Sequence, residues 1–125
     1  MRRLLGIGIA LTLAGCITPS IPIPPPDPSA MVFHLMTVNG ATSAQMTYPP
    51  DDLYKGGIAF VRDEASGLGS IQNVNPDGSV GPITLPAPVK LGDQVVFSVE
   101  NGDQTVSSCV VLREGPQDPT VYCGP

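Results

Sequence analysis

The chain has 125 residues, of which 14% are charged and 5% aromatic, and its formal net charge at pH 7 is −5. An acidic balance argues against nucleic acid or anionic lipid headgroups as partners, because both bind basic patches. With no Trp and so few aromatic residues, the chain can build only a thin core.

The first 16 residues have the layout of a cleaved secretory signal. Arg2 and Arg3 precede the apolar run Leu4–Leu13, and small residues then precede a cysteine. Ten residues are too few to cross a bilayer, which takes about 20 apolar residues. The tetrad Leu13-Ala14-Gly15-Cys16 resembles the lipobox of bacterial lipoproteins.

This resemblance implies a location. In bacterial lipoproteins the cysteine thiol receives a diacylglyceryl group and the preceding bond is cut, so the resemblance implies loss of residues 1–15 and lipidation of Cys16. Acyl chains then hold the protein on the membrane. Ile17 follows the cysteine. Because an Asp at that place retains enteric lipoproteins in the inner membrane, the resemblance implies delivery to the outer membrane, on its periplasmic or surface face.

Residues 16–30 are expected to form a proline-rich linker. Six of the 14 residues from Ile17 to Ala30 are proline, and this density favours polyproline II. At about 3.1 Å per residue, such a spacer holds a domain roughly 40 Å from the lipid. The alternative role of the segment is as a ligand for a proline-binding domain.

Removal of the signal leaves an acidic domain with two cysteines. Four basic residues then stand against all 11 acidic residues, so the net charge becomes −7. Cys109 and Cys123 are an even pair in an exported domain, where a disulfide is the natural assignment. A redox dithiol favours the C-x-x-C spacing, and a zinc site needs more ligands than two thiols and His34 supply.

Short apolar runs separated by turn residues fill the chain from residue 31 to residue 125. No run of adequate length has the apolar period of a helix. The sequence therefore predicts an all-β fold, a small antiparallel β-sandwich of about six to eight strands. The predicted strands are Met31–Val38, Gln45–Tyr48, Gly57–Arg62, Ser70–Val74, Val80–Leu85, Gln94–Glu100, Thr105–Leu112 and Thr120–Cys123.

Several of these strands carry clues to their place in a sheet. Gly57–Arg62 is apolar on both faces, which predicts a central strand. Gln45–Tyr48 is expected to be a short edge strand, and Pro82 demotes Val80–Leu85 to an edge or bulged strand. The turn Asn101-Gly102-Asp103 predicts a hairpin of the two strands around it.

A second resemblance covers the stretch from Gly57 to Glu100. A strand, the turn Asn75-Pro76-Asp77-Gly78-Ser79, another strand and then Gly92-Asp93 before the next strand are similar to bacterial immunoglobulin-like and prealbumin-like domains. The resemblance implies an adhesive, spacer or scaffolding module. Val80 stands where those families often have Phe.

One motif partly fits a metal loop. Asn73, Asn75 and Asp77, followed by Gly78, match the opening of a calcium-binding loop. The loop also needs a bidentate Glu at its twelfth position, where this chain has Thr84. The same residues suit a hairpin turn, which is the competing interpretation.

No residues suggest catalysis. His34, the single histidine, lies in an apolar run without an evident partner, and the serines lie in no nucleophile motif. The acidic pairs Asp51-Asp52 and Asp63-Glu64 are expected to be solvated turn residues. We therefore expect no enzyme and no cofactor, but an exported, lipid-anchored structural or protein-interaction module with an envelope or surface protein as partner. The alternative is a calcium- or carbohydrate-binding module.

Overall fold

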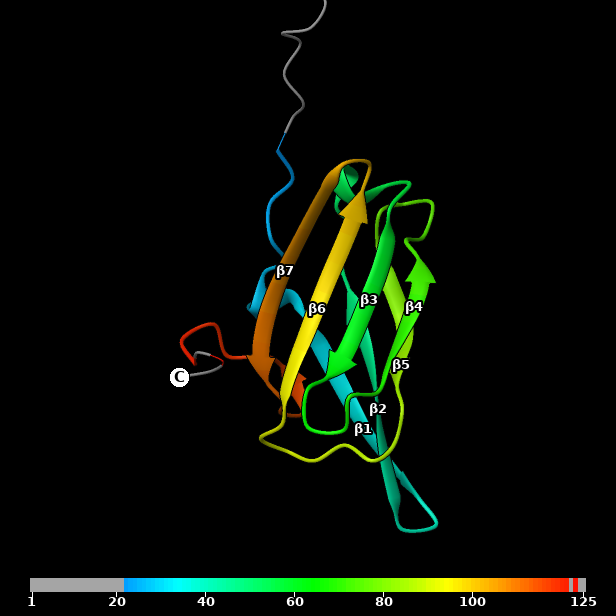
Figure 1. Cartoon of the computed structure of the whole chain (residues 1–125), viewed down its shortest axis with the longest axis vertical. Helices are drawn as coiled ribbons and strands as arrows, with labels where there is room; N and C mark the ends of the chain where they lie inside the picture. The colour runs from blue at the N-terminus through cyan, green and yellow to red at the C-terminus, as the bar shows by residue number, and fades with distance from the viewer. Residues whose placement is uncertain (1–21, 122, 124–125) are drawn as a thin grey trace, which may run out of the picture.

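The protein is an all-β sandwich. A computed structural model describes residues 22–121 and 123, in which eight strands form two antiparallel sheets packed face to face (Figure 1). The strands are β1 (Val32–Val38), β2 (Ala41–Tyr48), β3 (Ile58–Asp63), β4 (Gly69–Asn73), β5 (Val80–Leu85), β6 (Gln94–Asn101), β7 (Gln104–Val111) and β8 (Gly115–Pro116), with short 3₁₀ helices η1 (Pro28–Ala30) and η2 (Asp52–Tyr54). This architecture confirms the predicted fold class.

Each sheet has four strands. The first has the order β5-β2-β1-β8 and the second the order β4-β3-β6-β7. The chain therefore crosses between the sheets after β2, β4, β5 and β7. The predicted hairpin of β6 and β7 is confirmed, and β3 is central between β4 and β6 as its two apolar faces predicted.

The core lies between the sheets and follows the alternation of the strands. Val95, Phe97 and Val99 on β6 are all 0% exposed, whereas the residues between them face outward. The ring of Phe97 lies 5.5 Å from that of Tyr48, whose ring in turn lies 5.8 Å from that of Tyr54. Three aromatic rings thus connect both sheets and η2, which compensates for the scarcity of large side chains.

The hairpin of β1 and β2 projects from one end of the sandwich (Figure 1). Its turn is Asn39-Gly40, with φ values of 53° and 80°. Positive φ at both positions is the type I′ geometry, for which Asn-Gly is the preferred pair. Val38 beside the turn is 67% exposed, so an apolar side chain lies at the tip.

The predicted edge strand at Gln45–Tyr48 is wrong in both length and place. β2 begins at Ala41 and lies between β1 and β5. Ala44, Met46 and Tyr48 are buried at alternate positions. The polar residues between them concealed a full strand of period two. By contrast, β5 is an edge strand, as Pro82 predicted.

The carboxy-terminal segment also differs from the prediction. The described residues of the expected strand at Thr120–Cys123 form a turn and bend, in which the Asp118 carboxylate accepts from the Thr120 amide at 2.9 Å. The final strand is instead β8, which pairs with the start of β1. A disulfide joins Cys109 to Cys123, whose Cα atoms are 5.6 Å apart.

Candidate functional site

The proline-rich segment packs against the sandwich. Cys16 and the rest of the lipobox lie outside the described residues, which begin at Pro22. Residues 22–27, which we call the strap, run along the free edge of β7 (Figure 1). Ile23 is only 9% exposed, and its amide donates to the Gln104 side-chain oxygen at 2.8 Å. Further along, the Ser108 hydroxyl donates to the Pro26 carbonyl.

Two buried tyrosines hold the strap from within the sandwich. The Tyr54 hydroxyl donates to the Pro24 carbonyl at 2.8 Å, and the Tyr48 hydroxyl accepts from the Asp27 amide at 2.9 Å. Burial raises the pKa of Tyr54 well above its ordinary value, so this hydroxyl remains a donor. The expected linker over residues 16–30 is therefore part of the packed body from Ile23 onward. Its prolines have carbonyls but no N–H groups, so few donors need partners there.

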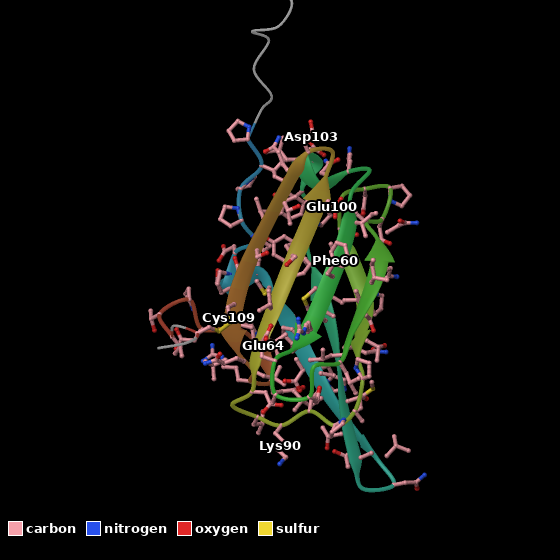
Figure 2. The ribbon with its side chains drawn as sticks, viewed as in Figure 1. Phe60, Glu64, Lys90, Glu100, Asp103 and Cys109 are labelled. Carbon is pink, nitrogen blue, oxygen red and sulfur yellow. A yellow bond between two sulfur atoms is a disulfide. The ribbon has the colours of Figure 1, made fainter. Side chains whose placement is uncertain are left out.

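The end of the sandwich where the strap begins is acidic. The Asn101 amide of the β6–β7 turn donates to the Leu53 and Lys55 carbonyls, which holds η2 beside that turn. Figure 2 shows Glu100 and Asp103 at this end and Lys90 at the other. The acidic residues gathered around η2 and the neighbouring turns are Asp51, Asp52, Asp77, Glu100 and Asp103.

The candidate calcium residues form a turn. The Asn75 amide nitrogen donates to the Ser79 hydroxyl and the Gly81 carbonyl, both at 3.0 Å. The Asp77 carboxylate accepts from the Ser79 amide at 2.9 Å and from its hydroxyl, and these bonds lower the pKa of Asp77. Asn73 is the last residue of β4, opposite Ile58. This geometry favours the hairpin-turn interpretation.

His34 has a partner that the sequence did not reveal. Its Nδ1 lies 2.7 Å from Oε1 of Glu114, and the other oxygen of Glu114 accepts from the Leu35 amide at 2.8 Å. The Leu35 amide and His34 together lower the pKa of Glu114. Both side chains are more than half exposed, so the pair joins the β7–β8 connection to the outside of β1 and forms no enclosed site.

Asp63 is buried, so its expected place on a solvated turn is wrong. It is 0% exposed at the end of β3, where its Oδ1 accepts from the Ala65 amide at 3.0 Å. Its Oδ2 is buried and meets no donor among the described residues. Burial first, and the neighbouring Asp93 carboxyl second, raise the pKa of Asp63. The surroundings of Asp63 therefore favour its protonated form.

The outer face of the second sheet carries an exposed apolar group. Phe60 on β3 pairs across the strands with Ile71 on β4, which is 64% exposed, and Ile58 is the next outward residue of β3. Shallow recesses of about 290 and 340 Å³ lie on the two sides of Ile71. Gly69 lines the first recess, and no larger residue fits there because a Cβ would lie 2.3 Å from the Val61 carbonyl oxygen.

The serine hydroxyls have structural partners. Ser70 donates to the Thr84 carbonyl, Ser107 and Ser98 bond each other at 2.7 Å, and Ser66 accepts from the Leu68 amide. Over residues 22–121 and 123, no group of three or more His, Cys, Asp or Glu side chains could hold a metal ion. In the same part of the chain, no helix has the length and apolarity needed to cross a bilayer.

Comparison with known proteins adds no family to this description. No protein-family model matches the chain, and neither the curated proteins nor the solved structures contain a significant match.

Proposed function

We propose that the protein is an exported lipoprotein, anchored in the outer membrane through Cys16, whose sandwich acts as a non-catalytic structural or protein-interaction module of the cell envelope. The single observation that carries this proposal is the tetrad Leu13-Ala14-Gly15-Cys16 behind a basic and apolar leader. The disulfide between Cys109 and Cys123 supports it, because disulfides persist in oxidising compartments.

The strand order supports an immunoglobulin-like arrangement of the sandwich. In immunoglobulin-like domains the third, sixth and seventh strands share one sheet, and an added fourth strand extends it on the side of the third. Here β4-β3-β6-β7 has that order, opposite β1, β2 and β5. Such folds serve many functions, so this likeness supports a module and no particular ligand.

The apolar group on β3 and β4 is where we propose that a protein partner binds. Exposed apolar side chains that lie together on a surface mark contacts with other molecules. Ile71 is 64% exposed beside Phe60 and lies between two recesses. Among the described residues, no other segment of this chain is paired with the outer edge of β4.

Mass spectrometry of the full-length protein purified from its own membranes tests the anchor. We expect the first residue to be Cys16 with acyl mass, and a Cys16→Ser variant to leave the membrane fraction. An unprocessed Met1 or an unmodified Cys16 would overturn the anchor. For the module, a photo-crosslinking residue at Ile71 should yield an adduct that the same residue at Thr37, on the other sheet, does not.

A further inference from the structure

The strap shortens the free chain between the lipid and the folded domain. A domain that began at Met31 would hang from Cys16 by 15 residues, which at about 3.4 Å each reach about 50 Å. The first packed residue is instead Ile23, with only seven residue steps to Cys16 and a reach of about 24 Å. Packing of the strap therefore halves the distance over which the domain can move.

The strap also determines which end of the sandwich is nearest the anchor. Ile23 is bonded to Gln104 beside the β6–β7 turn, whereas the tip of the β1–β2 hairpin lies at the opposite end (Figure 1). Four residues of β7 and the seven residues of β1 separate these points, or about 35 Å at about 3.3 Å per residue. A reach of about 24 Å cannot place the tip on the bilayer while Ile23 points away from it.

We infer that the strap limits the orientation of the domain on the membrane, so that on average the β6–β7 turn lies nearer the lipid than the β1–β2 hairpin does. This inference rests on the proposed lipid anchor at Cys16. The strap acts as a rigid continuation of the domain, because side chains of β7 and two buried tyrosines hold it along its length.

The charges at the anchored end keep it from close contact with the lipid but do not oppose the tether. The end that faces the lipid carries Asp51, Asp52, Asp77, Glu100 and Asp103, and its nearby basic residue is Lys55. Repulsion from anionic headgroups acts within about 8 Å at physiological ionic strength, so it prevents close contact without opposing a tether of about 24 Å. The far end presents Val38 and Leu91, each 67% exposed, to the space beyond the membrane.

Energy transfer from tryptophan to a lipid probe tests this orientation, because the chain has no Trp of its own. Two variants of the full, lipidated protein each receive a single Trp, Asp103→Trp near the anchor and Val38→Trp at the hairpin tip. Both are reconstituted in phosphatidylethanolamine and phosphatidylglycerol vesicles that contain a dansyl-labelled lipid. We expect transfer several-fold stronger from position 103 than from position 38. Equal transfer from both positions would overturn the inference.

Release of the strap should remove the difference in energy transfer between positions 103 and 38. The changes Ile23→Ser, Ser108→Ala, Tyr48→Phe and Tyr54→Phe together remove a buried side chain and three hydrogen bonds of the strap. With a reach of about 50 Å restored, transfer from the two positions should converge. Pro22→Ser, at an exposed neighbouring residue, is the matched control and should keep the difference.

Two further measurements test the packing of the strap and the lipid anchor independently of each other. Hydrogen exchange on the unaltered protein should show slow exchange at the Ile23 and Asp27 amides, and rapid exchange at both would overturn the strap whatever the variants do. Intact mass reports acylation of Cys16 in the same sample. An unmodified Cys16 overturns the anchor and the inference together, whereas acylated protein with equal transfer overturns the orientation alone.

Discussion

The two open sides of the sandwich are closed in different ways. On the side of β7 and β8, the strap covers the edge of β7, the disulfide ties down the carboxy terminus, and buried Gln117 fills the corner. On the side of β4 and β5, the two sheets approach each other, and the hydrogen bond between them there runs from the Ser70 hydroxyl to the Thr84 carbonyl. The first side thus has covalent and polar closures, and the second has little besides packing.

This difference follows from the small supply of large side chains. A thin core cannot bury enough apolar area to stabilise both sides equally, and small exported domains commonly add covalent links. Here the hydrogen bonds of the strap and the disulfide at the carboxy terminus act on the side of β7 and β8. The β4 side, with its exposed Ile71, remains the more accessible one.

Loss of the disulfide should have the largest effect. A double change, Cys109→Ser with Cys123→Ser, opens a loop with a sequence separation of 14. The chain-entropy model gives about 3 kcal/mol for a loop of about 15 residues. We expect the free energy of unfolding in urea to fall by about that amount. Reduction of the unaltered protein should give the same loss, and an unchanged midpoint in both cases would show that the closure of this side does not depend on the disulfide.

Two glutamines, one on each side, give the next contrast. Gln117 is 1% exposed, and its amide group bonds the Arg113 amide, the Arg113 carbonyl and the Gly115 carbonyl. We expect Gln117→Ala to lower stability by about 2 kcal/mol, because it leaves buried backbone groups unpaired.

The matched change on the β4 side is Gln72→Ala. The Gln72 side-chain oxygen is buried without a partner among the described residues. Its removal should therefore cost less than about 0.5 kcal/mol or stabilise the protein. Parallel urea titrations of the two variants measure the contrast. Equal losses would contradict the assignment of polar closure to one side.

The sheets were predictable because their signals are local. Val95, Phe97 and Val99 alternate with outward residues on β6, and Asn39-Gly40 marks a hairpin turn by its backbone preference alone. The central place of β2 was missed because its alanines weaken its strand propensity, and burial of Ala44 and Met46 depends on the opposite sheet.

The strap was not predictable, because its partners are distant in sequence. Ile23 bonds Gln104, and Ser108 bonds Pro26, over more than 80 residues in each case. A proline-rich composition indicates an extended chain but not what it contacts. The place of Asp63 at an inward position of β3 had a signal, the alternation of Ala59 and Val61 before it, which an acidic pair beside a turn concealed.

Replacement of Asp63 by asparagine should stabilise the protein. Burial and the neighbouring Asp93 carboxyl raise the pKa of Asp63, so the folded state holds its proton more tightly than the unfolded chain does. Stability from this group is present below the ordinary pKa of aspartate and is lost as pH rises through the raised folded pKa. Asp63→Asn keeps an acceptor for the Ala65 amide and adds a donor for Asp93.

We expect this variant to gain about 1 kcal/mol at pH 7 and to lose less stability between pH 4 and pH 7 than the unaltered protein. Thermal unfolding over that range provides the measurement. Asp77→Asn is a suitable control, since hydrogen bonds from Ser79 lower the pKa of Asp77 and its stabilising effect is lost as pH falls. A variant of Asp63 that is less stable at pH 7 and keeps its pH dependence would contradict the raised pKa of Asp63.

The smallest expected effect tests the hydrogen bond that joins the two sheets on the β4 side. Ser70→Ala removes the hydrogen bond to Thr84, and an ordinary hydrogen bond contributes about 1 kcal/mol or less to stability. Because the bond is partly solvated, water can replace the lost donor, so we expect a loss near about 0.5 kcal/mol. Ser108→Ala is the matched change on the strap side, where the Pro26 carbonyl belongs to a residue that is itself buried. Ser108→Ala should lower stability more than Ser70→Ala does, because no water can reach the buried Pro26 carbonyl to replace the lost donor. If urea titrations gave the reverse order, the strap would stabilise its side of the sandwich less than the Ser70 bond stabilises the β4 side. The contrast between the two sides would then be wrong.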